Sequence, residues 1–181
     1  MSENDSHLIE NVKQSDEDAF KTLFFQYQPM LFRFVVSKVM DKDIAEDIVQ
    51  ETFVRVWKIR ETLEPSKSFF SLIARIGNNL SIDHFKHLSV RARHKDQIIQ
   101  YESRRDNNPY SKVHSSHMQG EILQAVHDNL PSKCRNIFLL SRIEGLANNE
   151  IAEILDISQR TVENQLYRAL KILRKKLKDY L

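Results

Sequence analysis

Glycine, proline and cysteine are scarce in this chain of 181 residues, which contains 3 Gly, 4 Pro and 1 Cys. Tight turns depend on glycine and proline, so their scarcity disfavours many short strands joined by hairpins and favours long helices. The single cysteine, Cys134, cannot form a disulfide within the chain, which fits a reducing compartment.

Long apolar runs are also missing. No stretch approaches the roughly 20 consecutive apolar residues that a helix needs to cross a bilayer. The segment from Met1 to Asp18 is polar and acidic, whereas a secretory signal is basic and then apolar. The sequence therefore predicts a cytoplasmic protein without membrane insertion.

Charge is unevenly distributed, although the formal net charge is only +2. From Met1 to His87 the chain has 11 Lys/Arg and 14 Asp/Glu, and the remainder has 16 and 11. The segment Ser158 to Leu181 alone holds 7 basic and 2 acidic residues. A basic C-terminus is typical of a nucleic-acid-binding protein, although a solvated helix face can have the same composition.

Apolar residues recur at helical spacing through the N-terminal half. The pattern predicts a helix over 16–39, which Pro29 is expected to kink or split, and a second helix over 41–57. A third helix is expected to continue to about Lys86, with Ser66 or Ser68 as its N-cap.

The composition changes after this half. Apolar residues are sparse over 89–116, which predicts a linker, and helical periodicity resumes over 117–181. We therefore expect an all-α fold of two small helical domains, 1–88 and 117–181, joined by the flexible linker 89–116.

The most specific stretch of the sequence runs from Asn149 to Leu181. A short apolar helix is followed by Asp156-Ile157-Ser158, which can make the turn, and Ser158 can cap a second helix beginning at Gln159. An apolar stripe on that second helix leaves a polar and basic set outside it: Gln159, Arg160, Thr161, Glu163, Asn164, Arg168 and Lys171. Arg and Asn can pair with base edges in the major groove, and basic side chains can meet phosphates. A plain helical hairpin is the alternative.

Motifs in this half resemble region 4 of the sigma-70 family. They are Leu130-Pro131-Ser132-Lys133-Cys134-Arg135, Phe138-Leu139-Leu140, Glu144-Gly145-Leu146, Glu150-Ile151-Ala152, Thr161-Val162-Glu163 and Arg168-Ala169-Leu170. In that family the domain binds the −35 promoter element as duplex DNA and touches the polymerase flap. The resemblance implies that the polar and basic set named above contacts the −35 element. Asp156 stands where the family often has Gly.

A second resemblance lies between Asp43 and Phe53. Asp47, Gln50 and Glu51 fall on one face of the expected helix, and an acidic face suits a basic partner surface or simple solvation. The run resembles sigma region 2.2, which docks on the clamp coiled coil of RNA polymerase. The resemblance implies that these three residues bind core polymerase.

The stretch from Leu72 to Lys86 resembles sigma regions 2.3 and 2.4. Asn79 and Asp83 match the pattern, whereas Asn78 stands where Arg is usual. In the family this helix and the preceding loop, here 62–68, capture a flipped base of the −10 element. The implied −10 contacts are Lys67, Ser68, Arg75, Asn78, Asn79, Asp83 and Lys86. Phe69, Phe70 and Phe85 are expected to be mostly core.

No catalytic, metal or cofactor site is predicted. Asp43, Asp47 and Glu51 are four residues apart and could line one face, but no second acidic cluster or suitably spaced His accompanies them. The sequence also lacks a Gly-rich phosphate loop.

The resemblances imply a sigma factor of the extracytoplasmic-function group, since only the region-2-like and region-4-like domains are present. The implied partners are core RNA polymerase, promoter DNA and an anti-sigma factor. Two alternatives stay open. One is a homodimeric helix-turn-helix regulator that acts without polymerase, and the other is a metal-dependent nucleic-acid-processing enzyme.

Overall fold

The computed structural model describes residues 3–95, 126 and 128–177, and every regular element within them is helical. The N-terminal half contains α1 (Glu3–Lys13), α2 (Glu17–Val39), α3 (Lys42–Lys58), the short 3-10 turn η1 (Arg60–Thr62) and α4 (Phe69–Lys95). The C-terminal half contains α6 (Ser132–Phe138), the π-helical turn η2 (Leu139–Ile143), α7 (Asn148–Leu155) and α8 (Gln159–Leu177). The predicted all-α class is confirmed for these residues.

Helix α2 is one continuous helix, so the expected split at Pro29 was wrong. It begins where Asp16 Oδ1 accepts hydrogen bonds from the backbone N–H groups of Asp18 and Ala19, at 2.9 and 3.0 Å. It ends at Met40, whose left-handed φ of 58° stops the helix. Pro29 lies on the exposed side of α2, and the buried residues around it pack the helix against its neighbours. That packing offsets the cost of about 3 kcal/mol for an interior proline.

Helix α4 is longer than the sequence predicted. Its first turn is capped by Ser68, whose Oγ accepts a hydrogen bond from the backbone N–H of Ser71 at 3.2 Å. The helix then continues to Lys95 rather than ending near Lys86. Residues 89–95 of the predicted linker are therefore helical, and residues 96–116 lie outside the described part of the chain.

The C-terminal half contains the predicted helix-turn-helix. Asp156 adopts the left-handed conformation expected of it, with φ of 53°, and ends α7. The Oγ of Ser158 accepts from the backbone N–H of Thr161 at 3.1 Å and caps α8. At the start of α7 the backbone N–H of Ala147 donates to Glu150 Oε2 at 2.9 Å, which shows how local capping fixes both helix starts.

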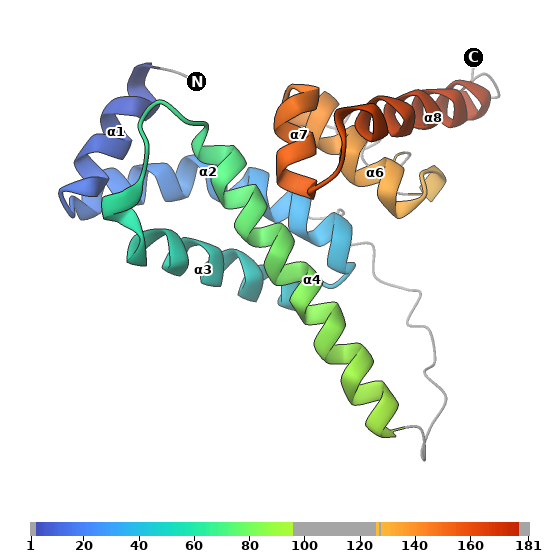
Figure 1. The fold of residues 1–181 in the computed structure, drawn as a ribbon, viewed down its shortest axis with the longest axis horizontal. Coiled ribbons are helices and arrows are strands. Elements are labelled where there is room, and N and C mark those ends of the chain that lie inside the picture. The colour runs from blue at the N-terminus through green and yellow to red at the C-terminus, as the bar shows by residue number, and fades with distance from the viewer. Residues whose placement is uncertain (1–2, 96–125, 127, 178–181) are drawn as a thin grey trace.

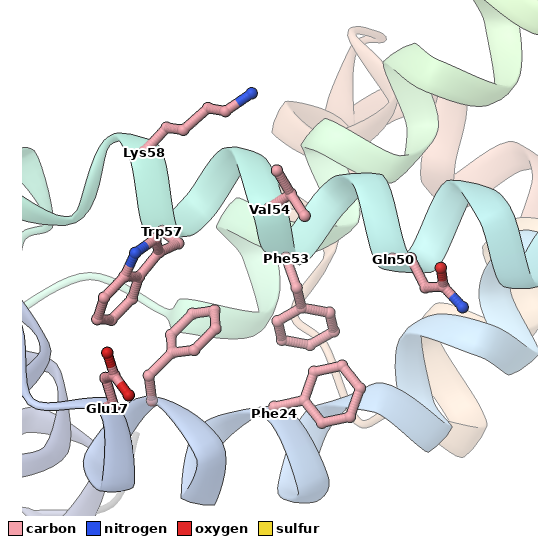
Figure 2. Close-up of a pocket in the computed structure, with 8 residues that line it drawn as sticks. Glu17, Phe24, Gln50, Phe53, Val54, Trp57 and Lys58 are labelled. Carbon is pink, nitrogen blue, oxygen red and sulfur yellow. The ribbon is translucent and has the colours of Figure 1, made fainter.

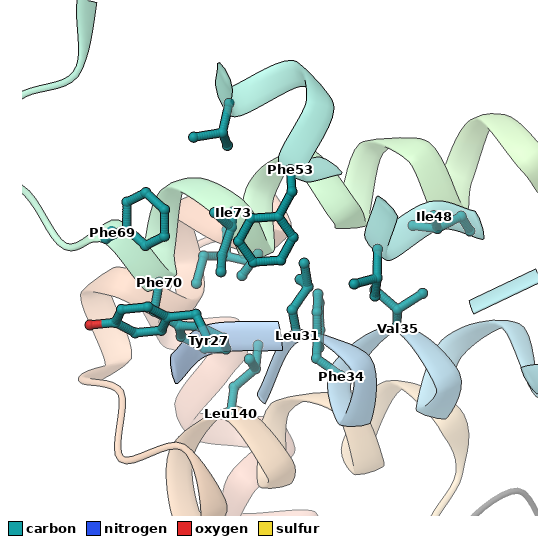
Figure 3. Close-up of a cluster of buried hydrophobic side chains, with 14 of the residues drawn as sticks. Tyr27, Leu31, Phe34, Val35, Ile48, Phe53, Phe69, Phe70, Ile73 and Leu140 are labelled. Atoms are coloured by element: carbon teal, nitrogen blue, oxygen red, sulfur yellow. The ribbon is translucent and has the colours of Figure 1, made fainter. Parts of the chain in front are cut away.

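The core lies between these helices, with α3 on one side of α2 and α4 and the C-terminal half on the other (Figure 1). Leu31, Phe34 and Val35 of α2 meet Phe53 of α3 and Ile73 of α4 in a buried cluster (Figure 3). The cluster continues into the C-terminal half through Ile137, Leu140, Ile151, Ile154, Val162 and Leu166. The two halves are therefore packed on each other, and the domain boundaries themselves stay a prediction.

Polar contacts reinforce this packing. Arg33 of α2 donates from Nε and Nη2 to the two carboxylate oxygens of Glu144, each at 3.0 Å. The Glu144 side chain is 3% exposed and that of Arg33 is 21% exposed. Ser37 Oγ donates to Asn136 Oδ1 at 2.9 Å. The contact between the halves is thus both apolar and ionic.

Candidate functional surfaces

The first candidate surface is the outer face of α3. Asp47 and Gln50 are exposed, and the Glu51 side chain is 45% exposed. Arg55, one turn later, donates from Nε to Glu51 Oε1 at 2.8 Å. This hydrogen bond, with the positive charges of Arg55 and Lys58, lowers the pKa of Glu51, which keeps the carboxylate ionised.

An apolar groove of about 590 Å³ runs beside this face, between α2 and α3. Trp57 and Phe53 project from α3 toward α2, where Phe24 and Glu17 stand (Figure 2). Gln50 lines the groove and also lines a second, smaller hollow of about 290 Å³ that Phe24 shares. The candidate face is therefore polar on the surface and continuous with aromatic hollows.

Sequence reasoning missed this groove. A signal was present in the spacing: Phe20 and Phe24 are four residues apart on α2, and Phe53 and Trp57 are four apart on α3. Such pairs lie on one face of a helix. What the spacing could not show is that both faces meet and leave Trp57 and Phe24 only partly covered.

The second candidate surface comprises the end of the loop after η1 and one face of α4. Lys67 is exposed and its Nζ contacts Glu64 Oε1 at 2.7 Å, while Ser68 is partly buried as the cap of α4. Four further predicted residues are exposed along α4: Arg75, Asn79, Asp83 and Lys86. Lys86 Nζ lies 3.3 Å from Asp83 Oδ1. Spacings of three and four bring these four side chains to one side of the helix.

Asn78 differs from the other predicted residues on α4. It is 3% exposed, and its Oδ1 accepts a hydrogen bond from the ammonium group of Lys38 on α2. Its side chain is turned into the fold in this conformation, which argues against a direct DNA contact there. Of the three phenylalanines expected to be mostly core, Phe69 and Phe70 are buried and Phe85 is exposed.

The third candidate surface is the outer face of α8. Val162, Leu166 and Ala169 are buried, which turns the opposite face of the helix to solvent. The exposed residues include six of the predicted set, Gln159, Arg160, Glu163, Asn164, Arg168 and Lys171. Thr161 is partly buried, and its Oγ1 lies 2.8 Å from the Oγ of Ser158.

Tyr167 belongs to the same face and was missed by sequence reasoning. It is 71% exposed, three residues after Asn164 and four before Lys171. The spacing alone could have placed it there, but an aromatic residue is more often assigned to the core stripe. Its exposure adds an aromatic ring to a surface that is otherwise polar and basic.

The described residues contain no group of three or more His, Cys, Asp or Glu side chains that could hold a metal ion. Among the same residues, no helix has both the length and the apolar character needed to cross a membrane.

Comparisons with known proteins match both halves of the chain. The family model for sigma-70 region 2 matches residues 23–90, and the model for sigma-70 region 4 matches residues 120–173. The ECF RNA polymerase sigma-E factor of Haemophilus influenzae is 26% identical, covering 96% of this chain and 95% of that protein. The ECF RNA polymerase sigma factor SigW of Bacillus subtilis is 28% identical, covering 94% and 95%.

Solved structures show the same fold. CnrH, solved in complex with the cytosolic domain of CnrY, has a TM-score of 0.67 at 21% identity, covering 98% of this chain and 99% of that one. RpoE of Bartonella quintana, solved with the anti-sigma factor NepR, has a TM-score of 0.67 at 20% identity, covering 88% and 96%. With both regions matched and relatives that align along nearly its whole length, the chain belongs to the sigma-70 family of RNA polymerase sigma factors, and within it to the extracytoplasmic-function group.

Proposed function

We propose that this sigma factor binds core RNA polymerase through the outer face of α3, the −35 element through α8, and unpaired −10 DNA through α4 and the loop before it. The observation that carries this assignment is that one chain exposes an acidic, aromatic-edged surface on α3 and a basic recognition face on α8. A protein that only bound DNA would need the second surface and not the first.

Polymerase binding by α3 is supported by its chemistry. Asp47 and Glu51 offer carboxylates and Gln50 offers an amide, groups that form charge-assisted hydrogen bonds with a basic partner. The groove lined by Phe24, Phe53 and Trp57 can take apolar side chains of the same partner. Buried aromatic contacts of this kind often dominate the energy of an interface, with polar groups around them giving specificity.

Recognition of the −35 element by α8 is supported by its exposed N-terminal residues. Arg160 and Asn164 have side chains that can pair with guanine and adenine edges in the major groove. Arg160 is held only by a loose ion pair with Glu163, at 3.8 Å on the surface. Such a pair is weak and leaves the guanidinium available. Arg168 and Lys171, farther along, suit phosphate contacts.

Capture of −10 DNA is supported by the exposed set on α4. Asn79 can bond to a base edge, while Lys67, Arg75 and Lys86 can meet the backbone of a single strand. Removing a base from its stack costs a few kcal/mol, which a fitted pocket must offset. Asn78 is left out of this assignment because its side chain is buried and bonded to Lys38.

The same proposal covers partners and location. CnrH was solved in complex with the cytosolic domain of CnrY, and RpoE in complex with the anti-sigma factor NepR; we extend an anti-sigma partner to this chain. In this proposal the sigma factor works in the cytoplasm, where it meets core polymerase, and it acts by binding rather than by catalysis.

The decisive experiment measures core-polymerase affinity for the wild type and for Glu51→Lys. Charge reversal should weaken binding at least tenfold and reduce run-off transcription in parallel. Glu10→Lys, a reversal at an exposed position of α1, is the matched control and should bind as the wild type does. Unchanged core affinity in Glu51→Lys would remove the interface assignment. Tight, dimeric binding to duplex promoter DNA before core is added would favour the homodimeric regulator instead.

A further inference from the structure

Helix α1 (Glu3–Lys13) was not predicted from the sequence, and it packs beside the loop that joins α3 to α4 (Figure 1). Ile9 and Val12 are buried against the core. On the loop side, Ser6 Oγ donates a hydrogen bond to the backbone carbonyl of Pro65 at 3.0 Å. A residue near the start of the chain is thus bonded directly to the middle of the loop.

The same helix is anchored to α2 by a buried carboxylate. Asp5 is 5% exposed and accepts hydrogen bonds from Tyr27 Oη at 2.8 Å and Gln26 Nε2 at 3.0 Å. The ring of Tyr27 lies 5.2 Å from Phe69 and 6.3 Å from Phe70, centre to centre. Those two residues begin α4, where the loop ends, so Asp5 is tied to the far end of the loop through one aromatic ring.

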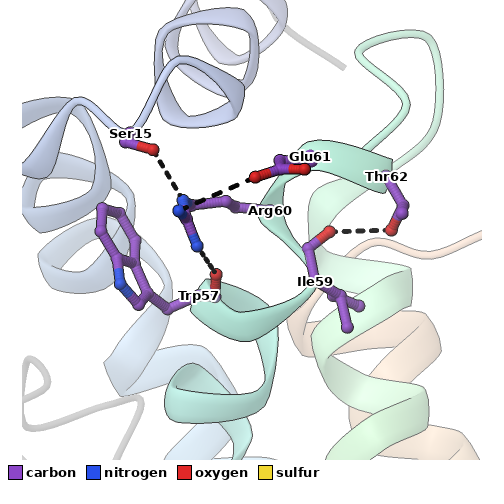
Figure 4. Close-up of polar contacts among 6 residues, drawn as sticks. All are labelled: Ser15, Trp57, Ile59, Arg60, Glu61 and Thr62. Carbon is purple, nitrogen blue, oxygen red and sulfur yellow. Dashed lines mark hydrogen bonds and ion pairs between the residues drawn. The ribbon is translucent and has the colours of Figure 1, made fainter.

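A second attachment holds the beginning of the loop. Ser15, just after α1, has φ of 67° and accepts from Arg60 Nε at 2.8 Å (Figure 4). Arg60 also donates from Nη1 to the carbonyl of Trp57 at 3.1 Å, and its Cζ atom lies 4.9 Å from the centre of the Trp57 ring. Leu63, the next residue after η1, is buried. The beginning and the middle of the loop are therefore held by α1 and the turn that follows it, and the far end packs on Tyr27 of α2, to which Asp5 of α1 is bonded.

We propose that α1 positions residues 63–68 for binding unpaired −10 DNA, with Ser6 and Ser15 as positioning residues. This rests on the proposed function, in which the loop contacts that DNA. The physical reason is preorganisation. A short surface loop that has to become ordered on binding loses affinity, and contacts that hold it in the bound shape beforehand remove that loss. Neither serine touches DNA in this scheme; each acts through the loop backbone or Arg60.

The test uses the full chain assembled with core polymerase. The probe is a fork-junction DNA whose single-stranded arm has been selected by wild-type holoenzyme from a randomised pool, with 2-aminopurine at successive arm positions. A rise in 2-aminopurine fluorescence reports a base that leaves the stack. Ser6→Ala should weaken binding of the arm about 3- to 10-fold, the size expected for one lost hydrogen bond, and reduce the fluorescence rise. Ser6→Thr, which keeps the hydroxyl, should restore both.

Further variants separate positioning from folding. Ser15→Gly tolerates the positive φ but removes the Oγ that Arg60 uses, and should weaken arm binding as Ser6→Ala does. Glu10→Ala, exposed on the same helix, should behave as the wild type. Core affinity and affinity for −35 duplex should stay unchanged in Ser6→Ala and Ser15→Gly, and the thermal midpoint should fall by no more than a few degrees, the shift expected for one lost hydrogen bond.

The outcomes distinguish the two proposals. Replacing 64–67 by Gly-Ser-Gly-Ser tests the loop itself. If this replacement weakens arm binding while Ser6→Ala and Ser15→Gly do not, the role of α1 is overturned and the loop assignment stands. If the replacement binds the arm as the wild type does, the −10 role of the loop is overturned, and the role of α1 with it. A parallel loss of core affinity in the serine variants would also overturn the positioning role.

Discussion

The ammonium group of Lys38 lies partly buried between α2 and α4, where it donates to Asn78 Oδ1 and stands 5.4 Å from the centre of the Phe34 ring. Burial makes the charged form costly, and it lowers the pKa of Lys38 from 10.5 to about 8. The residue is therefore both a structural partner of Asn78 and a group whose titration affects stability.

Lys38→Met should change how stability depends on pH. Because the pKa of Lys38 is lower in the folded chain than in the unfolded one, the folded chain binds fewer protons between pH 8 and 10.5. Stability contributed by this group therefore rises with pH across that interval and is lost as pH falls. We expect the free energy of unfolding of the wild type, measured with urea from pH 7 to 10, to rise relative to that of Lys38→Met. A difference in unfolding free energy that stays constant across this pH range would contradict the prediction. Lys21→Met, at an exposed site, is the control.

Arg160→Ala should weaken recognition of the −35 element. Arg160 is exposed at the N-terminal end of α8, and a lost base contact of this kind costs about 1–3 kcal/mol. Competition binding of holoenzyme to duplexes with single base changes measures the loss, which should be concentrated at one or two positions. Arg142→Ala removes an exposed arginine from η2 and should leave the preference intact. An unaltered preference in Arg160→Ala would exclude that residue as a base contact.

At the scale of elements, three helices meet closely at Gly77 of α4. A Cβ atom there would lie 3.1 Å from Leu31 Cδ1 and 3.3 Å from Val35 Cγ2, both on α2, and 3.5 Å from Thr52 Oγ1 on α3. The missing side chain thus permits the close packing of α4 on both neighbours, even though glycine is a poor helix former.

Gly77→Val should destabilise the fold. Two methyl groups beyond the Cβ would overlap Leu31 and Val35, and overpacking of this kind costs about 1–3 kcal/mol. Chemical unfolding measures the loss. Asn79→Val places the same side chain at an exposed position of the same helix and controls for the helix propensity of valine. Equal stability of the two variants would show that α2 and α4 can move apart enough to accept the valine side chain.

At the scale of the whole molecule, the two halves are joined by the buried pair of Arg33 and Glu144. Desolvation raises the pKa of Glu144, and the hydrogen bonds and charge of Arg33 act against that rise. Removing Arg33 would leave a buried carboxylate with its main counter-charge gone, so the pKa of Glu144 would rise further.

Arg33→Met should therefore be more destabilising at pH 7.5 than at pH 4.5. A raised folded-state pKa means that the folded chain keeps a proton that the unfolded chain releases, so stability is lost as pH rises through that value. Breaking a buried pair costs about 3–5 kcal/mol at neutral pH, and protonation of Glu144 should recover part of it at pH 4.5. The measurement is the difference in unfolding free energy between variant and wild type at each pH. The same loss of unfolding free energy at pH 7.5 and at pH 4.5 would contradict the prediction. The control is Arg55→Met, which breaks a surface pair and should cost under about 1 kcal/mol.

Local sequence patterns were enough to predict several helices of this protein, their ends and their exposed faces. Apolar spacing predicted α2, α3 and α8, and single residues such as Ser158 and Asp156 fixed the ends of α7 and α8, because caps and left-handed turns depend on near neighbours in sequence. The exposed faces of α3 and α8 followed from the same periodicity, since the polar side of an amphipathic helix turns to solvent.

Other features depend on contacts between residues far apart in the chain, and only the tertiary structure decided them. The resemblance predicted a DNA contact for Asn78, but Lys38, 40 positions earlier, holds its side chain inside. Helix α1 is polar and short, and its place became evident only from the bonds of Asp5 to Tyr27 and of Ser6 to Pro65. The packing of the two halves, with Glu144 paired to Arg33, could not be predicted for the same reason. Periodicity shows which face of a helix is apolar, but not which other helix covers it.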